Sequence, residues 1–186
     1  DKLGSPVQWH QDWAFYPHTN DNLLAVGVAI DDMTTENGCL MVIPGSHKGK
    51  IYSHHQNGKF IGAVTDLEFK PEGTVPIELK AGGISIHHVR MLHGSAINTS
   101  DKPRRLLLAQ YCALDAWPIV VLNKVNDVLE QFKSEIIRGE LTIEPRLADV
   151  PIRIPAPADA KPSSIYHQQL ELQNPTIEIK DSQRAT

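Results

Sequence analysis

Short apolar segments separated by turn residues are the feature that most restricts what this chain can fold into. Aliphatic residues dominate each segment, and Gly, Asn or Pro occurs between them, as in Lys80–Gly83. Runs of this length bounded by turn signals predict β-strands. The clearest segments are residues 22–31, 39–44, 84–88 and 104–111. At 186 residues and 41% hydrophobic content, the chain is expected to form one compact domain with a sizeable core.

His10 and Asp12 are predicted metal ligands, and they lie between segments of β-favouring apolar and aromatic residues. Side chains at i and i+2 of a strand point to the same face, about 6–7 Å apart along the backbone, so one ion can bind both. A third ligand must come from elsewhere in the chain. Three protein ligands that leave open positions suit non-haem Fe(II). A structural zinc site would require four ligands and favour cysteines, but Cys39 and Cys112 have no metal-ligand spacing.

The chain resembles the phytanoyl-CoA dioxygenase family of Fe(II)- and 2-oxoglutarate-dependent oxygenases in the order and spacing of several motifs. These are HQD at 10–12, ENGCLMVIPGSHKG at 36–49, HHVRMLHGS at 87–95 and NTSDKPRR at 98–105. The resemblance implies a double-stranded β-helix core, the cupin-like jelly roll, in which His10, Asp12 and His93 bind Fe(II). It also implies that 2-oxoglutarate chelates the iron and that Arg104 holds the distal carboxylate of this cosubstrate.

Arg104 suits this role because a guanidinium forms two parallel charge-assisted hydrogen bonds with a carboxylate. Arg105 is the competing candidate, but alternation along a strand sends the two side chains to opposite faces. The offset from His93 matches the family for Arg104. Ser95 is either a small turn residue or a hydroxyl donor to the same carboxylate.

The resemblance further implies a reaction in which O2 and 2-oxoglutarate are consumed and an unactivated carbon of a small-molecule substrate is hydroxylated. Succinate and CO2 are the coproducts. The alternative is a catalytically inactive jelly-roll module that binds a metal or a ligand. The sequence leaves open whether the substrate is an acyl-CoA or another metabolite, and it does not indicate the oligomeric state.

The remaining histidines near these motifs are expected to serve the structure. His88 is predicted to be a hydrogen-bonded core or pocket-wall residue, and His87 is expected to face the other way. His54 and His55 precede a Gln-Asn-Gly turn and are predicted to be exposed.

One domain with an appended tail is predicted. Residues 1–117 are expected to form the jelly-roll core, without the N-terminal part that the family normally has before its His-x-Asp motif. Residues 118–186 are expected to form a C-terminal helix and a proline-rich tail that pack on the same domain. Helical spacing predicts the helix over 118–138, and the proline-rich stretch 145–162 is expected to be extended.

The composition gives no reason to expect association with nucleic acid or membranes, because 22 acidic and 18 basic residues leave a net charge of −4. No apolar run is long enough for a membrane-spanning helix. The two cysteines lie in separate segments, which favours reduced thiols over a disulfide framework. We therefore expect an intracellular protein, cytoplasmic rather than peroxisomal.

Overall fold

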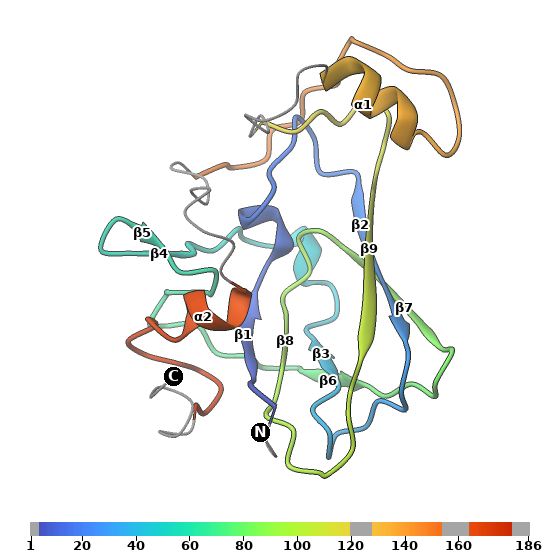
Figure 1. Cartoon of the computed structure of the whole chain (residues 1–186). Helices are drawn as coiled ribbons and strands as arrows, with labels where there is room; N and C mark the ends of the chain where they lie inside the picture. The colour runs from blue at the N-terminus through green and yellow to red at the C-terminus, as the bar shows by residue number, and fades with distance from the viewer. Residues whose placement is uncertain (1–3, 120–127, 154–163, 180–186) are drawn as a thin grey trace.

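Two antiparallel β-sheets form the core of the computed structural model, which describes residues 4–119, 128–153 and 164–179. The first sheet has the strand order β1-β8-β3-β6 and the second has the order β7-β2-β9, while β4 and β5 form a separate hairpin (Figure 1). The described strands make open sheets rather than a closed barrel. The mainly β, jelly-roll fold predicted from the sequence is confirmed. The elements of this core are β1 Val7–His10, η1 Asp12–Ala14, β2 Leu23–Ala29, β3 Leu40–Val42, η2 Ser46–Lys48, β4 His55–Gln56, β5 Lys59–Phe60, β6 Val75–Ile77, β7 Ile84–His88, β8 His93–Ser95 and β9 Leu106–Cys112.

Strand β2 lies in the middle of the second sheet, and after the buried Leu23 its two faces differ in side-chain size. The small residues Ala25, Gly27 and Ala29 are buried on the inner face. Larger residues alternate with them on the outer face, where the paired strands add further aliphatic side chains. Among the exposed outer-face residues are Leu24, Ile84, Ile86, Leu107 and Tyr111. The inner face of β2 therefore leaves space between the two sheets.

The expectation that one strand carries both His10 and Asp12 is wrong. Strand β1 ends at His10, and Asp12 begins the short 3-10 helix η1. The chain leaves the strand because the Gln11 N–H donates to the side chain of His54, and the Trp13 N–H donates to the Val89 carbonyl at 3.0 Å. These partners lie outside the first sheet, so strand pairing ends at His10.

Helix α1 (Val128–Glu135) covers part of the predicted helix 118–138, and residues 120–127 lie outside the described part of the chain. The helix ends earlier than expected because the residues that follow lack a packing surface: Ile137 is 82% exposed. Residues 145–153 have no helix or strand, as expected, and 154–162 lie outside the described residues. Within the described ranges, no helix has both the length and the apolar character needed to cross a bilayer.

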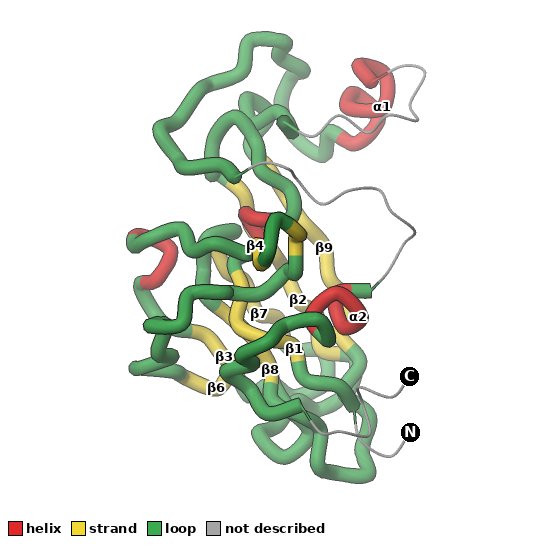
Figure 2. The backbone as a smooth tube through the Cα atoms, turned by 90° about the vertical axis from the view of Figure 1, so that its left-hand side faces the viewer, coloured by secondary structure: helices red, strands yellow, loops and turns green. Residues whose placement is uncertain are grey.

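A short helix that the sequence did not predict, α2 (Ile165–Gln169), lies beside β1 in both views (Figures 1 and 2). Gln169 is buried there: its Oε1 accepts from the Gln8 N–H at 2.7 Å, and its Nε2 donates to the Gly62 carbonyl at 2.7 Å. The Gln8 side chain in turn donates to the carbonyl of Ile177 and accepts from its N–H. These hydrogen bonds attach residues 164–179 to the first sheet.

Candidate metal centre

His10 at the end of β1, Asp12 in η1 and His93 at the start of β8 meet in one group. Their three ligand atoms all lie within 4.8 Å of one another. His10 Nε2 lies 3.6 Å from Asp12 Oδ1, and His93 Nε2 lies 3.5 Å from the same oxygen. An ion about 2 Å from each atom spans separations of this size. The strand register explains the convergence, because β1 and β8 pair His10 directly with His93.

The backbone fixes the tautomer of both imidazoles. His10 Nδ1 donates to the Gln8 carbonyl at 2.7 Å, and His93 Nδ1 donates to the Met91 carbonyl at 2.9 Å. A carbonyl oxygen only accepts, so each Nδ1 carries the hydrogen and each Nε2 keeps a free lone pair. Metal-binding histidines usually have their second ring nitrogen held in this way. Two imidazole nitrogens and one carboxylate form a donor set that fits Fe(II).

Burial keeps the two imidazoles neutral. It lowers the pKa of His93 to about 3 and also lowers the pKa of His10, so neither ring is protonated near pH 7. Burial alone would raise the pKa of Asp12, but its interactions with the surrounding histidines, His93 first, outweigh burial and lower this pKa below its ordinary value. Neutral imidazoles and an ionised carboxylate are the protonation states that bind a metal.

Gln11, between the two N-terminal ligands, is fully buried and connects the ligand turn to two loops. Its side-chain nitrogen donates to the carbonyls of Lys50 at 3.1 Å and Arg90 at 3.0 Å. Its side-chain oxygen accepts from the Tyr52 N–H at 2.9 Å. The turn that carries Asp12 is therefore held by polar contacts to segments far away in the sequence.

His54 supports the same turn, and the prediction that it is exposed is wrong. The ring is buried, burial lowers its pKa to about 4, and Nε2 accepts from the Gln11 N–H at 2.9 Å. Its Nδ1 donates to the Tyr52 carbonyl at 3.1 Å. His55, also expected to be exposed, is half-buried. Sequence analysis missed both because they lie in an irregular segment whose burial depends on distant contacts.

The ligand group opens onto a cavity of about 370 Å³ between the two sheets. Both sheets contribute to its lining, and α2 adds Tyr166. Besides the three predicted ligands, the lining from the sheets includes Val7, Leu40, Gly94 and Ser95 of the first sheet and Ala25, Ser85, His87, Leu106, Leu108 and Gln110 of the second.

His87 rather than His88 faces this cavity, so the prediction for these two residues is wrong. Strand β7 pairs with β2 in a register that sets His87 opposite the inward-facing Ala25. His87 Nε2 lies 3.6 Å from Asp12 Oδ2, and its ring centroid lies 4.5 Å from that of His93. His88 belongs to the outer face of the sheet. A shift of one residue in β7 decides which histidine reaches the site.

Arg104, immediately before β9, borders the same cavity, and its Nη2 donates to the buried Ser95 Oγ at 3.4 Å. The ion pairs found among the described residues do not include Arg104. Arg105 is engaged elsewhere, because its Nε and Nη2 donate to the two carboxylate oxygens of Asp31 at 2.9 and 2.8 Å. The structure thus brings Arg104 and Ser95 together at the cavity onto which the ligand group opens. Their role towards 2-oxoglutarate stays a prediction.

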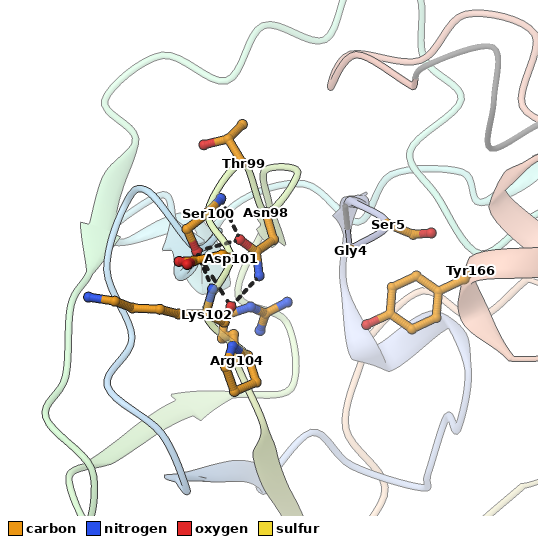
Figure 3. A pocket seen from close by; sticks show the side chains of 10 residues that line it. Gly4, Ser5, Asn98, Thr99, Ser100, Asp101, Lys102, Arg104 and Tyr166 are labelled. Carbon is orange, nitrogen blue, oxygen red and sulfur yellow. Dashed lines mark hydrogen bonds between the residues drawn. The ribbon is translucent and has the colours of Figure 1, made fainter. Parts of the chain in front are cut away.

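A second cavity, of about 820 Å³, adjoins the first at Arg104 and Tyr166, which line both. Figure 3 shows the loop 98–102 on one side of it and Tyr166 with Gly4 and Ser5 on the other. The loop is closed by its own hydrogen bonds, such as the one from the Asn98 side-chain amide to the Lys102 carbonyl at 2.8 Å. Arg104 therefore borders both cavities.

Comparison with known proteins gives consistent matches. The sequence profile of the phytanoyl-CoA dioxygenase (PhyH) family matches residues 1–106. A probable alpha-ketoglutarate-dependent hypophosphite dioxygenase from Stutzerimonas stutzeri is 39% identical over 175 residues, which cover 91% of this chain and 60% of the relative.

Two solved structures are similar in fold. EvdO2 from Micromonospora carbonacea var. aurantiaca, in complex with 2-oxoglutarate, gives a TM-score of 0.51 at 28% identity, over 66% of this chain and 50% of EvdO2. The epimerase SnoN, in complex with Fe3+, alpha ketoglutarate and nogalamycin RO, gives a TM-score of 0.53 at 30% identity, over 61% of this chain and 44% of SnoN. The chain spans 60% or less of the length of each protein named.

Proposed function

The chain belongs to the phytanoyl-CoA dioxygenase family, and we propose from this that the protein is an Fe(II)- and 2-oxoglutarate-dependent dioxygenase that hydroxylates a small-molecule substrate. One observation carries the proposal. His10, Asp12 and His93, from three separate elements, present one ligand atom each to a common point, and Arg104 borders the same cavity. A binding module without turnover would not require this combination.

When bound, Fe(II) and 2-oxoglutarate supply the oxidation: 2-oxoglutarate and O2 yield succinate and CO2, and one oxygen atom of O2 enters the substrate. The side chains of the protein bind and orient. His10 and His93 offer neutral Nε2 atoms, and Asp12 adds one negative charge that helps to retain a divalent cation. Arg104 binds the distal carboxylate of 2-oxoglutarate, with the Ser95 hydroxyl beside it.

Two kinds of bond in the substrate are candidates for hydroxylation. The first is an unactivated C–H bond, the usual outcome of this chemistry. The second is the P–H bond of a small phosphorus oxyanion, because the Stutzerimonas stutzeri relative, at 39% identity, is named a probable hypophosphite dioxygenase. We place the reaction inside the cell, where 2-oxoglutarate and ferrous iron are available.

The test is the binding of Fe(II) and 2-oxoglutarate to the protein under anaerobic conditions. We expect a weak visible charge-transfer band, because the cosubstrate chelates the iron directly. The Arg104→Lys variant should raise the concentration of 2-oxoglutarate that half-saturates the band by roughly tenfold or more, since lysine loses the two-pronged contact. Arg105→Ala is the matched control, because Arg105 pairs with Asp31 outside the cavity, and it should leave this concentration unchanged.

Turnover is then measured as succinate release with hypophosphite and with a panel of metabolites. A band accompanied by substrate-dependent succinate release supports the dioxygenase. The absence of a band in correctly folded wild-type protein would instead favour the catalytically inactive binding module.

A further inference from the structure

The inner face of the second sheet carries polar side chains beside the ligand group. In the strand register, Ala25 of β2 has His87 of β7 on one side and Gln110 of β9 on the other. All three line the cavity of about 370 Å³. Because the middle residue is an alanine, the space in front of the two polar side chains is not filled by a side chain of β2.

Of these three residues, His87 is the one whose polar side-chain atoms lack hydrogen-bond partners among the described residues. Its side chain is 6% exposed, and both ring nitrogens are buried without a hydrogen-bond partner among the described residues. The nearest acidic atom, Asp12 Oδ2, lies 3.6 Å from Nε2, which is too long for a hydrogen bond. A neutral imidazole always has one donor and one acceptor nitrogen, and buried polar atoms are normally paired. Among the described residues, His87 therefore has no partner at Nδ1 and only the long contact with Asp12 at Nε2, so its ring can bind a further polar group.

The neighbouring histidines differ from His87 because the protein supplies hydrogen-bond partners for their rings. His10 and His93 each donate from Nδ1 to a backbone carbonyl, and His54 is bonded at both ring nitrogens. His87 is also not one of the three residues whose ligand atoms lie within 4.8 Å of one another. Neither protein packing nor the predicted iron ligation accounts for its orientation into the cavity.

The distal carboxylate of the predicted 2-oxoglutarate does not account for the orientation of His87 either. Arg104 precedes Leu106, which pairs with Ala29, whereas His87 pairs with Ala25. Four residues along a strand correspond to about 13 Å, so Arg104 and His87 lie towards opposite ends of the cavity. The distal carboxylate of a cosubstrate held at Arg104 is therefore out of reach of the His87 ring.

We propose that His87 is a binding residue for the primary substrate and that this substrate is a small oxyanion with an oxygen acceptor on the reacting atom. The inference rests on the proposed function. Since His87 lies beside Asp12, the oxygen that it binds must be close to the bond being hydroxylated. In a small oxyanion such as hypophosphite, the oxygens and the reacting hydrogens share one central atom. A hydrocarbon segment without an oxygen at the same position would leave both ring nitrogens without a hydrogen-bond partner from the substrate.

The experiment uses the full protein with Fe(II) and 2-oxoglutarate under anaerobic conditions, with hypophosphite as the probe. Hypophosphite should shift the charge-transfer band of the wild-type protein in a saturable manner. In His87→Ala, the band itself should persist, but the hypophosphite concentration for half of the shift should rise roughly tenfold or more, as expected for the loss of a hydrogen bond to a charged ligand. His87→Gln keeps a donor and should lie between the two.

His88→Gln is the matched control, because it changes the adjacent histidine on the outer face of the same strand, and it should behave as the wild type. In aerobic assays, the defect of His87→Ala should appear mainly in KM for hypophosphite rather than in KM for 2-oxoglutarate. A wild-type protein with the band but without a response to hypophosphite would overturn the inference. So would an unchanged response in His87→Ala, or loss of its band. The absence of a band in the wild-type protein would refute the proposed function instead.

Discussion

Replacing Gln11 with leucine tests whether buried polar contacts hold the turn that carries Asp12. The side chain makes hydrogen bonds to Lys50, Arg90 and Tyr52, and none of its surface is exposed. Each such bond contributes about 1 kcal/mol to stability, so losing all of them should lower the free energy of unfolding by about 3 kcal/mol. That is a large part of the roughly 5–15 kcal/mol that stabilises a typical domain.

The assay is urea unfolding of the metal-free protein, followed by circular dichroism. For a urea m-value of about 2 kcal/mol/M, the midpoint of Gln11→Leu should fall by roughly 1.5 M. Fe(II) affinity should fall roughly 10- to 100-fold, as is typical when a residue that orients metal ligands is replaced. Metal affinity is measured by anaerobic titration in buffer, well below the unfolding transition.

Gln131→Leu is the control because Gln131 is a half-buried glutamine of α1, far from the site, whose side-chain amide donates within its own helix to Glu135 Oε1 at 3.0 Å. It should change the free energy of unfolding by no more than about 0.5 kcal/mol. A midpoint for Gln11→Leu that coincides with that of Gln131→Leu would refute the energetic argument. Unchanged Fe(II) affinity, despite the expected loss of stability, would show that the turn holds Asp12 without this side chain.

Three further results are expected. Gly27→Val should lower stability by about 1–3 kcal/mol in thermal unfolding, because a Cβ there would lie 2.8 Å from Ser85 Oγ and 3.1 Å from Leu106 Cδ1. Gln8→Leu removes both hydrogen bonds to Ile177 and should make the C-terminal segment more sensitive to limited proteolysis, while the sheets stay intact. Fe(II) at 100 times its Kd should stabilise the wild-type protein by about 2.7 kcal/mol, and Asp12→Ala should abolish this gain.

The structure brings His10, Asp12 and His93 together, and the sequence could single out these three residues because its signal is local and chemical; their role as metal ligands stays a prediction. His10 and Asp12 are only two positions apart. His93 is predicted as the third ligand because the segment HHVRMLHGS resembles a motif of the family. The strand geometry predicted for the first pair is nevertheless wrong, since Asp12 lies in η1 and not on the strand. The two side chains converge because the chain turns after His10, and this turn depends on contacts to residues 50–54 and 89–90.

The prediction that His88 lines the pocket and His87 faces away is wrong because it depends on the register of the strand. Adjacent residues on a strand face opposite sides, so one position decides the outcome, and that position is set by pairing with β2. Strand β2 itself misleads, because within residues 24–29 the larger residues, such as Leu24, point outwards and the small residues point inwards. The usual rule that large apolar side chains face the interior holds where a core is filled, but here the inner face borders a cavity.

The two sheets contribute differently to the site: the first carries the two predicted histidine ligands, and the second carries the side chains proposed for substrate binding, of which His87 also contacts Asp12 at 3.6 Å. His10 and His93 are oriented by carbonyls of their own chain segments, at Gln8 and Met91, next to the pairing of β1 with β8. No hydrogen bond that orients either imidazole comes from the second sheet. Side chains of β7 and β9 that face the cavity can therefore change the shape and polarity of the substrate position without moving these two ligands. On this reasoning, substitutions on the inner face of the second sheet should alter which molecule is oxidised before they alter the binding of iron.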